Sequence, residues 1–131
     1  NKMLHIPGLY IANSSNRGRG VFTAQEIETG DLIEICPLLI ILKKDVSAIH
    51  KTVLHDYYFL LEKPNGAACI ALGYGSIYNH QSEPNAIVIF DYEKKEIEIQ
   101  ASKKIEPGNE IFIDYTDGGK EEAPLWFTPN D

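Results

Sequence analysis

Turn-forming residues interrupt this chain so often that only short regular elements fit between them. The sequence holds ten glycines and seven prolines in 131 residues, and together with asparagine they divide its apolar stretches at close intervals. Short apolar runs separated in this way favour strands over helices. A chain of this length can bury a core without disulfides or bound metals. The sequence therefore predicts one mainly β domain.

Two stretches carry most of this prediction. Residues 32–42, LIEICPLLIIL, are expected to be extended and broken at Pro37. Residues 85–102 are expected to form a hairpin, with NAIVIFDY and EIEIQAS joined by EKK. In the second strand apolar and polar side chains alternate, which predicts one buried and one solvated face. The alternating residues are Ile97, Ile99 and Ala101 against Glu96, Glu98 and Gln100.

One helix is expected, over residues 45–57. Apolar residues recur there at helical spacing, and Asp45 can cap the start. The apolar residues are Val46, Ile49, Val53 and Leu54.

Residues 27–33 (IETGDLI) and 105–111 (IEPGNEI) share one pattern. A glycine that accepts a positive φ, followed by Asp or Asn, turns the chain into a strand. We interpret the pair as one turn used twice, not as a duplicated domain.

The net charge of the chain indicates what kind of partner it can bind. Twelve basic against nineteen acidic residues give a formal net charge of −7, which disfavours nucleic acid as a direct partner and suits a basic polypeptide.

Cys36 and Cys69 are far apart and form no CxxC pair, so we expect two buried thiols and no metal cluster. No apolar run approaches the roughly 20 residues of a membrane span, and no secretory pattern is present. We therefore expect a reducing, cytosolic type of setting and no membrane partner.

Three polar or glycine-rich stretches stand out. In SSNRGRGVFTA (residues 14–24), Gly18 and Gly20 precede a strand, where a ligand could approach the backbone and Arg17 or Arg19 could meet an anionic group. Alone, this stretch indicates a tight turn.

The second stretch, GSIYNHQSEPNA (residues 75–86), places Asn79, His80, Pro84 and Asn85 close together, which indicates either a turn or a site. The third, GNEIFIDY (residues 108–115), ends a probable strand on Tyr115. Alone, that tyrosine would be an ordinary amphipathic core residue.

In this order, RGRGVF, NHxxxPN and GNEIFIDY resemble the SET domain family of protein-lysine N-methyltransferases, in a minimal form without cysteine-rich flanking segments. The motifs span about residues 8–116, and we expect residues 1–131 to form a single SET domain. The resemblance implies a SET-type β-clip with one or two short helices and a knot-like C-terminal crossing.

The resemblance also implies a cofactor and a site. Such domains bind S-adenosylmethionine on one face, release S-adenosylhomocysteine, and receive the substrate lysine through a channel from the other face. It assigns the cofactor to Asn79 and His80 and to the stretch that holds Arg17, Gly18, Arg19 and Gly20.

By the same likeness, Tyr115 is the catalytic tyrosine. Tyr57, in DYYF, is a second candidate for the channel, although Tyr58 adjoins it. Within the tail 117–131, Trp126 and Phe127 either close the channel as a lid or anchor the C-terminus, and Trp126 is a further candidate for the cofactor site. The chemistry requires no metal.

The sequence departs from the family pattern at Gly75, Ser76 and Gln81, around the Asn-His pair, and lacks a cysteine-rich closing segment. These departures keep open a non-catalytic SET-fold module that binds a lysine-bearing peptide or the cofactor. An unrelated all-β adaptor is a third interpretation. Acidic residues at 91–98 indicate either a solvated face or a track for a basic tail.

For the enzyme, we expect a basic protein or peptide as substrate, such as a histone, and a homodimer is compatible with a domain of this type. We expect a cytoplasmic location in a bacterium and a nuclear one in a eukaryote or for a virus.

Overall fold

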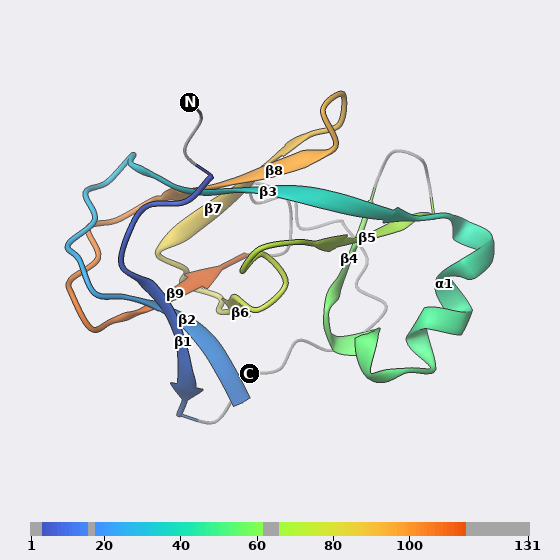
Figure 1. Ribbon diagram of the computed structural model, residues 1–131, viewed down its shortest axis with the longest axis horizontal. Helices are drawn as coiled ribbons and strands as arrows, with labels where there is room; N and C mark the ends of the chain where they lie inside the picture. Colours follow the sequence, from blue (N-terminus) through green and yellow to red (C-terminus); the bar gives the residue numbers. More distant parts are fainter. Residues whose placement is uncertain (1–3, 16–17, 62–65, 115–131) are drawn as a thin grey trace.

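The computed structural model describes residues 4–15, 18–61 and 66–114. These residues form two β-sheets, with a single α-helix at one end (Figure 1). The predicted mainly β fold with one or two short helices is confirmed. The strands are β1 Leu9–Ser14, β2 Gly18–Thr23, β3 Leu32–Ile41, β4 Tyr58–Leu60, β5 Ala68–Ala71, β6 Asn79–His80, β7 Ala86–Asp91, β8 Glu96–Ala101 and β9 Glu110–Ile113. The helices are α1 Lys43–His50 and the 3-10 helix η1 Val53–Asp56.

The two sheets divide the strands between them. One sheet has the order β1-β2-β9-β6 and the other has the order β4-β5-β3-β8-β7. The pairing of β6 with β9 is parallel, whereas β2 pairs with β9 in the antiparallel sense. The first sheet thus brings together segments from the start, the middle and the end of the described chain.

Strand β3 is continuous through Pro37, so the expected break at that residue is wrong. Up to and including Pro37 the strand pairs with β8, and from Leu38 onward it pairs with β5. A proline has no N–H to donate to a ladder, and Pro37 lies at the point where β3 exchanges β8 for β5 as its neighbour. The irregularity of β3 lies instead between Leu32 and Glu34, where its register with β8 shifts.

The predicted hairpin is confirmed as β7 and β8, which pair antiparallel from Ala86 with Ala101 to Asp91 with Glu96. Its alternation is also confirmed: Ile97, Ile99 and Ala101 are buried, whereas the residues between them are partly exposed.

The expected helix over residues 45–57 is shorter and divided. Helix α1 begins at Lys43 and ends at His50, and Asp45 lies in its first turn without capping it. The interruption comes from Thr52, whose hydroxyl donates to the Ile49 carbonyl at 2.7 Å and accepts from the Leu54 N–H at 3.1 Å. Such side-chain hydrogen bonds compete with those of the helix backbone. Helix α1 therefore ends at His50, and the separate helix η1 begins at Val53, directly after Thr52.

The repeated turn pattern is confirmed and has a second role. Gly30 and Gly108 take φ values of 91° and 87°, and strands β3 and β9 begin soon after them. The two copies also pair with each other, because Ile27 and Ile105 form an antiparallel bridge with hydrogen bonds of 2.9 and 2.8 Å.

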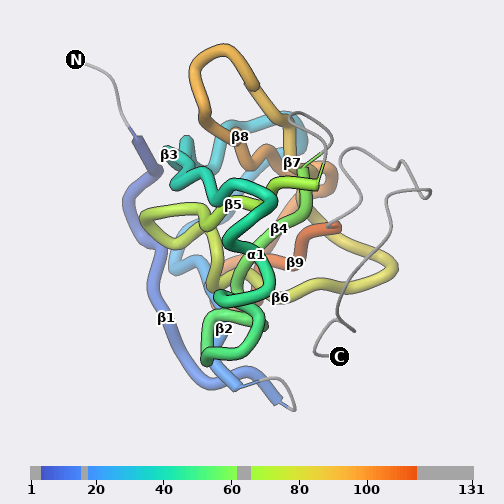
Figure 2. Tube along the Cα trace, turned by 90° about the vertical axis from the view of Figure 1, so that its right-hand side faces the viewer, coloured from blue at the N-terminus to red at the C-terminus, as the bar shows by residue number. Residues whose placement is uncertain are grey.

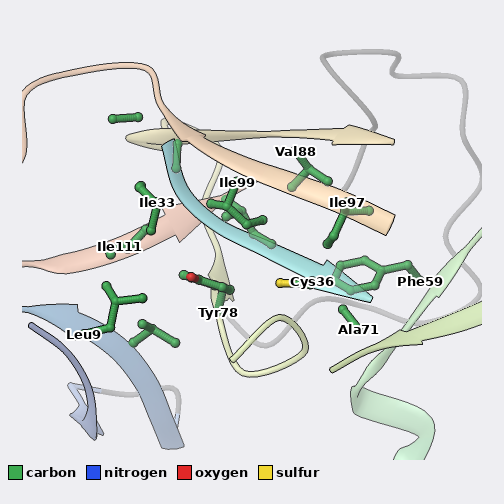
Figure 3. Close-up of a cluster of buried hydrophobic side chains, with 14 of the residues drawn as sticks. Leu9, Ile33, Cys36, Phe59, Ala71, Tyr78, Val88, Ile97, Ile99 and Ile111 are labelled. Carbon is green, nitrogen blue, oxygen red and sulfur yellow. The ribbon is translucent and has the colours of Figure 1, made fainter. Parts of the chain in front are cut away.

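The larger core cluster lies between the two sheets and includes Cys36 and Tyr78 (Figure 3). Cys69 belongs to the same cluster. Both cysteines are buried free thiols, as expected. A second cluster is formed by Ile41, Val46, Tyr58 and Ala68. Val46 belongs to α1, which lies toward the viewer in Figure 2. In the described residues, no helix has the length and apolar character that crossing a membrane requires.

Candidate functional site

The side chain of Asn79 connects all three sequence motifs. Its Nδ2 atom donates to the carbonyl oxygen of Arg19 at 3.1 Å and to Oε2 of Glu110 at 2.7 Å. The residue is 7% exposed. One amide therefore joins the RGRG stretch, the Asn-His pair and the GNEIFI strand.

Glu110 receives a second donor from the start of the chain. Its Oε1 atom accepts from the Ser14 hydroxyl at 2.6 Å. Gly20 leaves the space for this carboxylate, because a Cβ at that position would collide with Glu110 Oε2 and would lie 2.8 Å from Asn79 Nδ2. Gly20 is thus required for close approach.

The spacing of NHxxxPN follows from how the segment wraps around β9. Asn79 pairs with Phe112 and His80 with Ile113 along the parallel ladder. Farther on, the Asn85 side chain donates to the Glu110 carbonyl at 3.0 Å and accepts from the Phe112 N–H at 2.8 Å. Both asparagines of the motif therefore hold the same short strand.

The buried carboxylate of Glu34 contacts the turn that leads into the segment Asn79–His80. Glu34, on β3, is 2% exposed. Its Oε1 accepts from the Tyr78 hydroxyl at 2.6 Å and its Oε2 accepts from the Tyr74 N–H at 2.9 Å. Burial raises the pKa of the Glu34 carboxyl, although both donors favour its ionised form. Burial, together with the adjacent Glu34, also raises the pKa of Tyr78 well above its usual value.

The structure brings five of the predicted cofactor residues into one region. Gly18, Arg19 and Gly20 lie on β2, and Asn79 contacts the backbone of that strand. His80 follows on β6 and is partly buried. Three further predicted residues, Arg17, Tyr115 and Trp126, lie outside the described residues, and their roles stay predictions.

Tyr57 is not joined to this group. It lies between η1 and β4, on the side of the other sheet, and its backbone N–H bonds to Leu54 at 2.9 Å. Among the described residues, no hydrogen bond links Tyr57 to the Asn79 cluster, which consists of Asn79, Arg19, Glu110 and Ser14. Its place in a lysine channel stays a prediction.

Sequence reasoning missed Ser14, Glu34 and Glu110. Glu110 is part of the motif GNEIFIDY, and a charged residue inside an otherwise apolar strand was the available signal. Glu34 gave the same signal in LIEICPLL. In the described part of the chain, three or more His, Cys, Asp or Glu side chains nowhere gather in a way that could hold a metal ion.

Comparison with known proteins shows the family of this chain. The model of the SET domain family matches residues 18–116. A histone-lysine N-methyltransferase from Schizosaccharomyces pombe, named as H3 lysine-37 specific, is 32% identical over 120 residues, which cover 91% of this chain and 76% of that protein. The crystal structure of a Plasmodium falciparum protein assigned as a histone methyltransferase matches with a TM-score of 0.66 at 34% identity, over 82% of this chain and 92% of that one.

The fold is that of a SET methyltransferase. The chain belongs to the SET domain family, and lysine methyltransferase activity is the function that the family and these relatives support. The resemblance read from the three motifs is thereby confirmed.

Proposed function

We propose that this SET domain transfers a methyl group from S-adenosylmethionine to the ε-amine of a lysine in a basic protein, with a histone as the first candidate. The observation that carries the proposal is the Asn79 amide, which joins the three family motifs through Arg19 and Glu110.

The residues around Asn79 fit such a cofactor. Both N–H groups of its amide are used by acceptors on Arg19 and Glu110, and among the described residues no partner is found for Oδ1. A carbonyl oxygen held in this way suits the α-ammonium group of the cofactor. Gly18 and Arg19 are exposed residues beside it, and Gly18 has no side chain to obstruct the approach of a ligand to the backbone.

The bound cofactor would supply an electrophilic methyl group on a sulfonium. The protein has to supply a lysine nitrogen with a free lone pair. At an ordinary pKa of about 10.4, only about one lysine in 2,500 is neutral at pH 7, which corresponds to roughly 4.6 kcal/mol. A dry channel lowers the lysine pKa because it disfavours the ammonium form.

Tyr115 is proposed to align this amine. Strand β9 ends at Ile113, which pairs with His80 of the cofactor segment. The chain therefore leaves β9 next to the proposed cofactor site, two residues before Tyr115. A phenol oxygen at that position would hold the nitrogen in line with the methyl group, and positioning of this kind accounts for much of the acceleration in such reactions. Tyr57 is proposed as a second residue of the channel.

The proposed substrate, a basic protein such as a histone, is based on the net charge of this chain and on the name of a similar protein. A formal net charge of −7 favours a basic polypeptide, and the Schizosaccharomyces pombe relative is named for histone H3. A histone substrate would place the reaction in the nucleus of a eukaryotic cell. The alternative of a non-catalytic binding module is not favoured by the names of the relatives.

Three finer proposals remain. Residues 1–131 are proposed to be one domain, with Trp126 and the tail 117–131 as its lid or C-terminal anchor, and a homodimer is its proposed assembly.

The test is methyl transfer from radiolabelled S-adenosylmethionine to a panel of purified core histones and unrelated basic proteins. Label that is found on lysine, and that is lost when the labelled lysine is replaced by arginine, would support the proposal. Absence of label on every basic protein, in a preparation that binds the cofactor, would favour the binding module instead.

A further inference from the structure

We propose that Glu34 is a positioning residue for the cofactor segment Asn79–His80, and that it acts through the buried hydroxyl of Tyr78. This inference rests on the proposed function, because it concerns the affinity of the same cofactor site. It assigns a role to a buried carboxylate that the reaction itself does not use.

The carboxylate fixes both ends of one short turn. Its two oxygens accept from the Tyr74 N–H at 2.9 Å and from the Tyr78 hydroxyl at 2.6 Å. Tyr78 is 1% exposed and is followed directly by Asn79. The place where β6 begins is therefore set by where the tyrosine ring and its hydroxyl are held.

The turn is shaped to receive this carboxylate. Gly73 has a φ of +70°, and a Cβ there would collide with Glu34 Oε2. Gly75 is constrained by space alone, because a Cβ there would collide with the Ala71 Cβ on β5 and would lie 2.9 Å from Cys36 Sγ on β3. The departure from the family pattern at Gly75 and Ser76 thus falls inside a turn pressed against β3.

The same turn is also tied to β5. The Ala71 N–H donates to the Ser76 hydroxyl at 2.9 Å, and the Ser76 N–H donates to the Ala71 carbonyl at 3.2 Å. The turn is therefore anchored to two strands of the five-stranded sheet, whereas Asn79 belongs to the four-stranded sheet. Glu34 links the two sheets at the point where the cofactor segment starts.

The chemistry favours a role in specificity over one in stability alone. A buried carboxylate is costly to desolvate, and an apolar side chain of similar size often serves a core as well or better. What the carboxylate adds is direction, since its two oxygens accept two donors at fixed positions. Asn79 needs such placement because its amide must reach both Arg19 and Glu110.

The experiment measures the dissociation constant of S-adenosylhomocysteine by calorimetry for the wild-type chain, Tyr78→Phe, Glu34→Ala and the double variant. All are measured well below their unfolding temperatures. We expect each single variant to bind about tenfold more weakly, as for the loss of one buried hydrogen bond, and the double variant to lose little more. The KM for S-adenosylmethionine should rise while kcat at saturating cofactor stays nearly constant.

Two further variants separate positioning from stability. Glu34→Gln can still accept the Tyr74 N–H, and the Tyr78 hydroxyl can rotate to accept from its amide, so affinity should be largely restored. Tyr58→Phe is the matched control, because Tyr58 is also 1% exposed and its hydroxyl lies 2.9 Å from His50 Nδ1 in the other core cluster. It should lower the unfolding temperature without changing the dissociation constant.

Unchanged affinity in Tyr78→Phe would overturn the inference and leave the proposed function standing. So would an equal loss in Tyr58→Phe, or losses that add in the double variant, because independent sites are additive. If Glu34→Ala does not fold, Tyr78→Phe still carries the test, since it keeps the aromatic ring. A wild-type chain that binds no S-adenosylhomocysteine would overturn the proposed function and this inference together.

Discussion

The side-chain amide of Asn79 donates a 2.7 Å hydrogen bond to the carboxylate of Glu110, 31 residues later in the chain. The same nitrogen also donates to the Arg19 carbonyl. Because acceptors take both N–H groups, the orientation of the amide is fixed and its carbonyl oxygen faces the other way. The contact between these two residues therefore determines which atom of Asn79 is offered to a ligand.

Replacement of Glu110 by alanine should weaken S-adenosylhomocysteine binding about tenfold, because a buried amide loses an acceptor and its orientation is no longer fixed. Glu110→Gln keeps an acceptor for Asn79 and should lose much less. Glu106→Ala, an exposed carboxylate near the start of the same strand, is the control and should bind like wild type. Equal affinity in Glu110→Ala and wild type, measured by calorimetry, would contradict this account.

Gly20→Ala should abolish or strongly weaken cofactor binding, because the added Cβ collides with the Glu110 carboxylate and crowds Asn79. Gly108→Ala is the matched control. Its Cβ would meet open space, but its φ of +87° makes alanine unfavourable by about 1–2 kcal/mol. The control should lose stability and keep its affinity, as measured by thermal unfolding and calorimetry on both variants. A Gly20→Ala protein with normal affinity would remove close approach as the reason for this glycine.

Tyr115→Phe should reduce turnover strongly while the chain stays folded and still binds the cofactor. The hydroxyl of Tyr115 is proposed to align the amine, and its removal leaves the hydrogen bonds of Asn79 to Arg19 and Glu110 unchanged. Methyl transfer is measured at saturating cofactor, with circular dichroism and calorimetry as checks on folding and binding. Turnover equal to that of wild type would eliminate the role assigned to this tyrosine.

The burial of Glu34 predicts a dependence of stability on pH. Burial raises its pKa in the folded state above the unfolded value of about 4.3, so the folded state binds this proton more tightly. The associated stability is present below the unfolded pKa and is lost as pH rises through the folded pKa.

The measurement is urea unfolding of wild type and Glu34→Gln at a series of pH values. The wild-type free energy of unfolding, minus that of the variant, should fall as pH rises from about 4 toward neutrality. The variant cannot titrate at residue 34, so the other carboxyls largely cancel in the difference. A difference that stays flat or grows with pH would contradict a raised pKa.

Much of the fold could be read from periodicity and turn residues. The alternation of Ile97 and Ile99 with glutamates gave a correct hairpin strand because one face is buried. The repeated glycine turns at Gly30 and Gly108 were predicted correctly because their positive φ is a local requirement. The helix was misjudged because apolar spacing alone does not reveal that Thr52 bonds to its own backbone neighbours.

The site could be predicted only in part, for a physical reason. Asn79, Arg19 and Gly20 were indicated by their motifs, but the residues that orient them come from distant strands. Ser14 reaches Glu110 across 96 positions, and Glu34 reaches Tyr78 across 44. The first pair depends on how β1 and β9 are placed within one sheet, and the second depends on how the turn before β6 packs against β3 of the other sheet. A sequence shows only that each carboxylate interrupts an apolar run.

The central claim is that the Asn79 cluster is a site for S-adenosylmethionine, and calorimetric titration tests it most directly. Wild type, Asn79→Ala and the control Asn109→Ala, an exposed asparagine beside Glu110, are titrated with S-adenosylmethionine and with S-adenosylhomocysteine. The account predicts saturable binding of both ligands by wild type and the control, and its loss in Asn79→Ala. Binding that is unaffected by Asn79→Ala, or no binding by the intact chain, would contradict it.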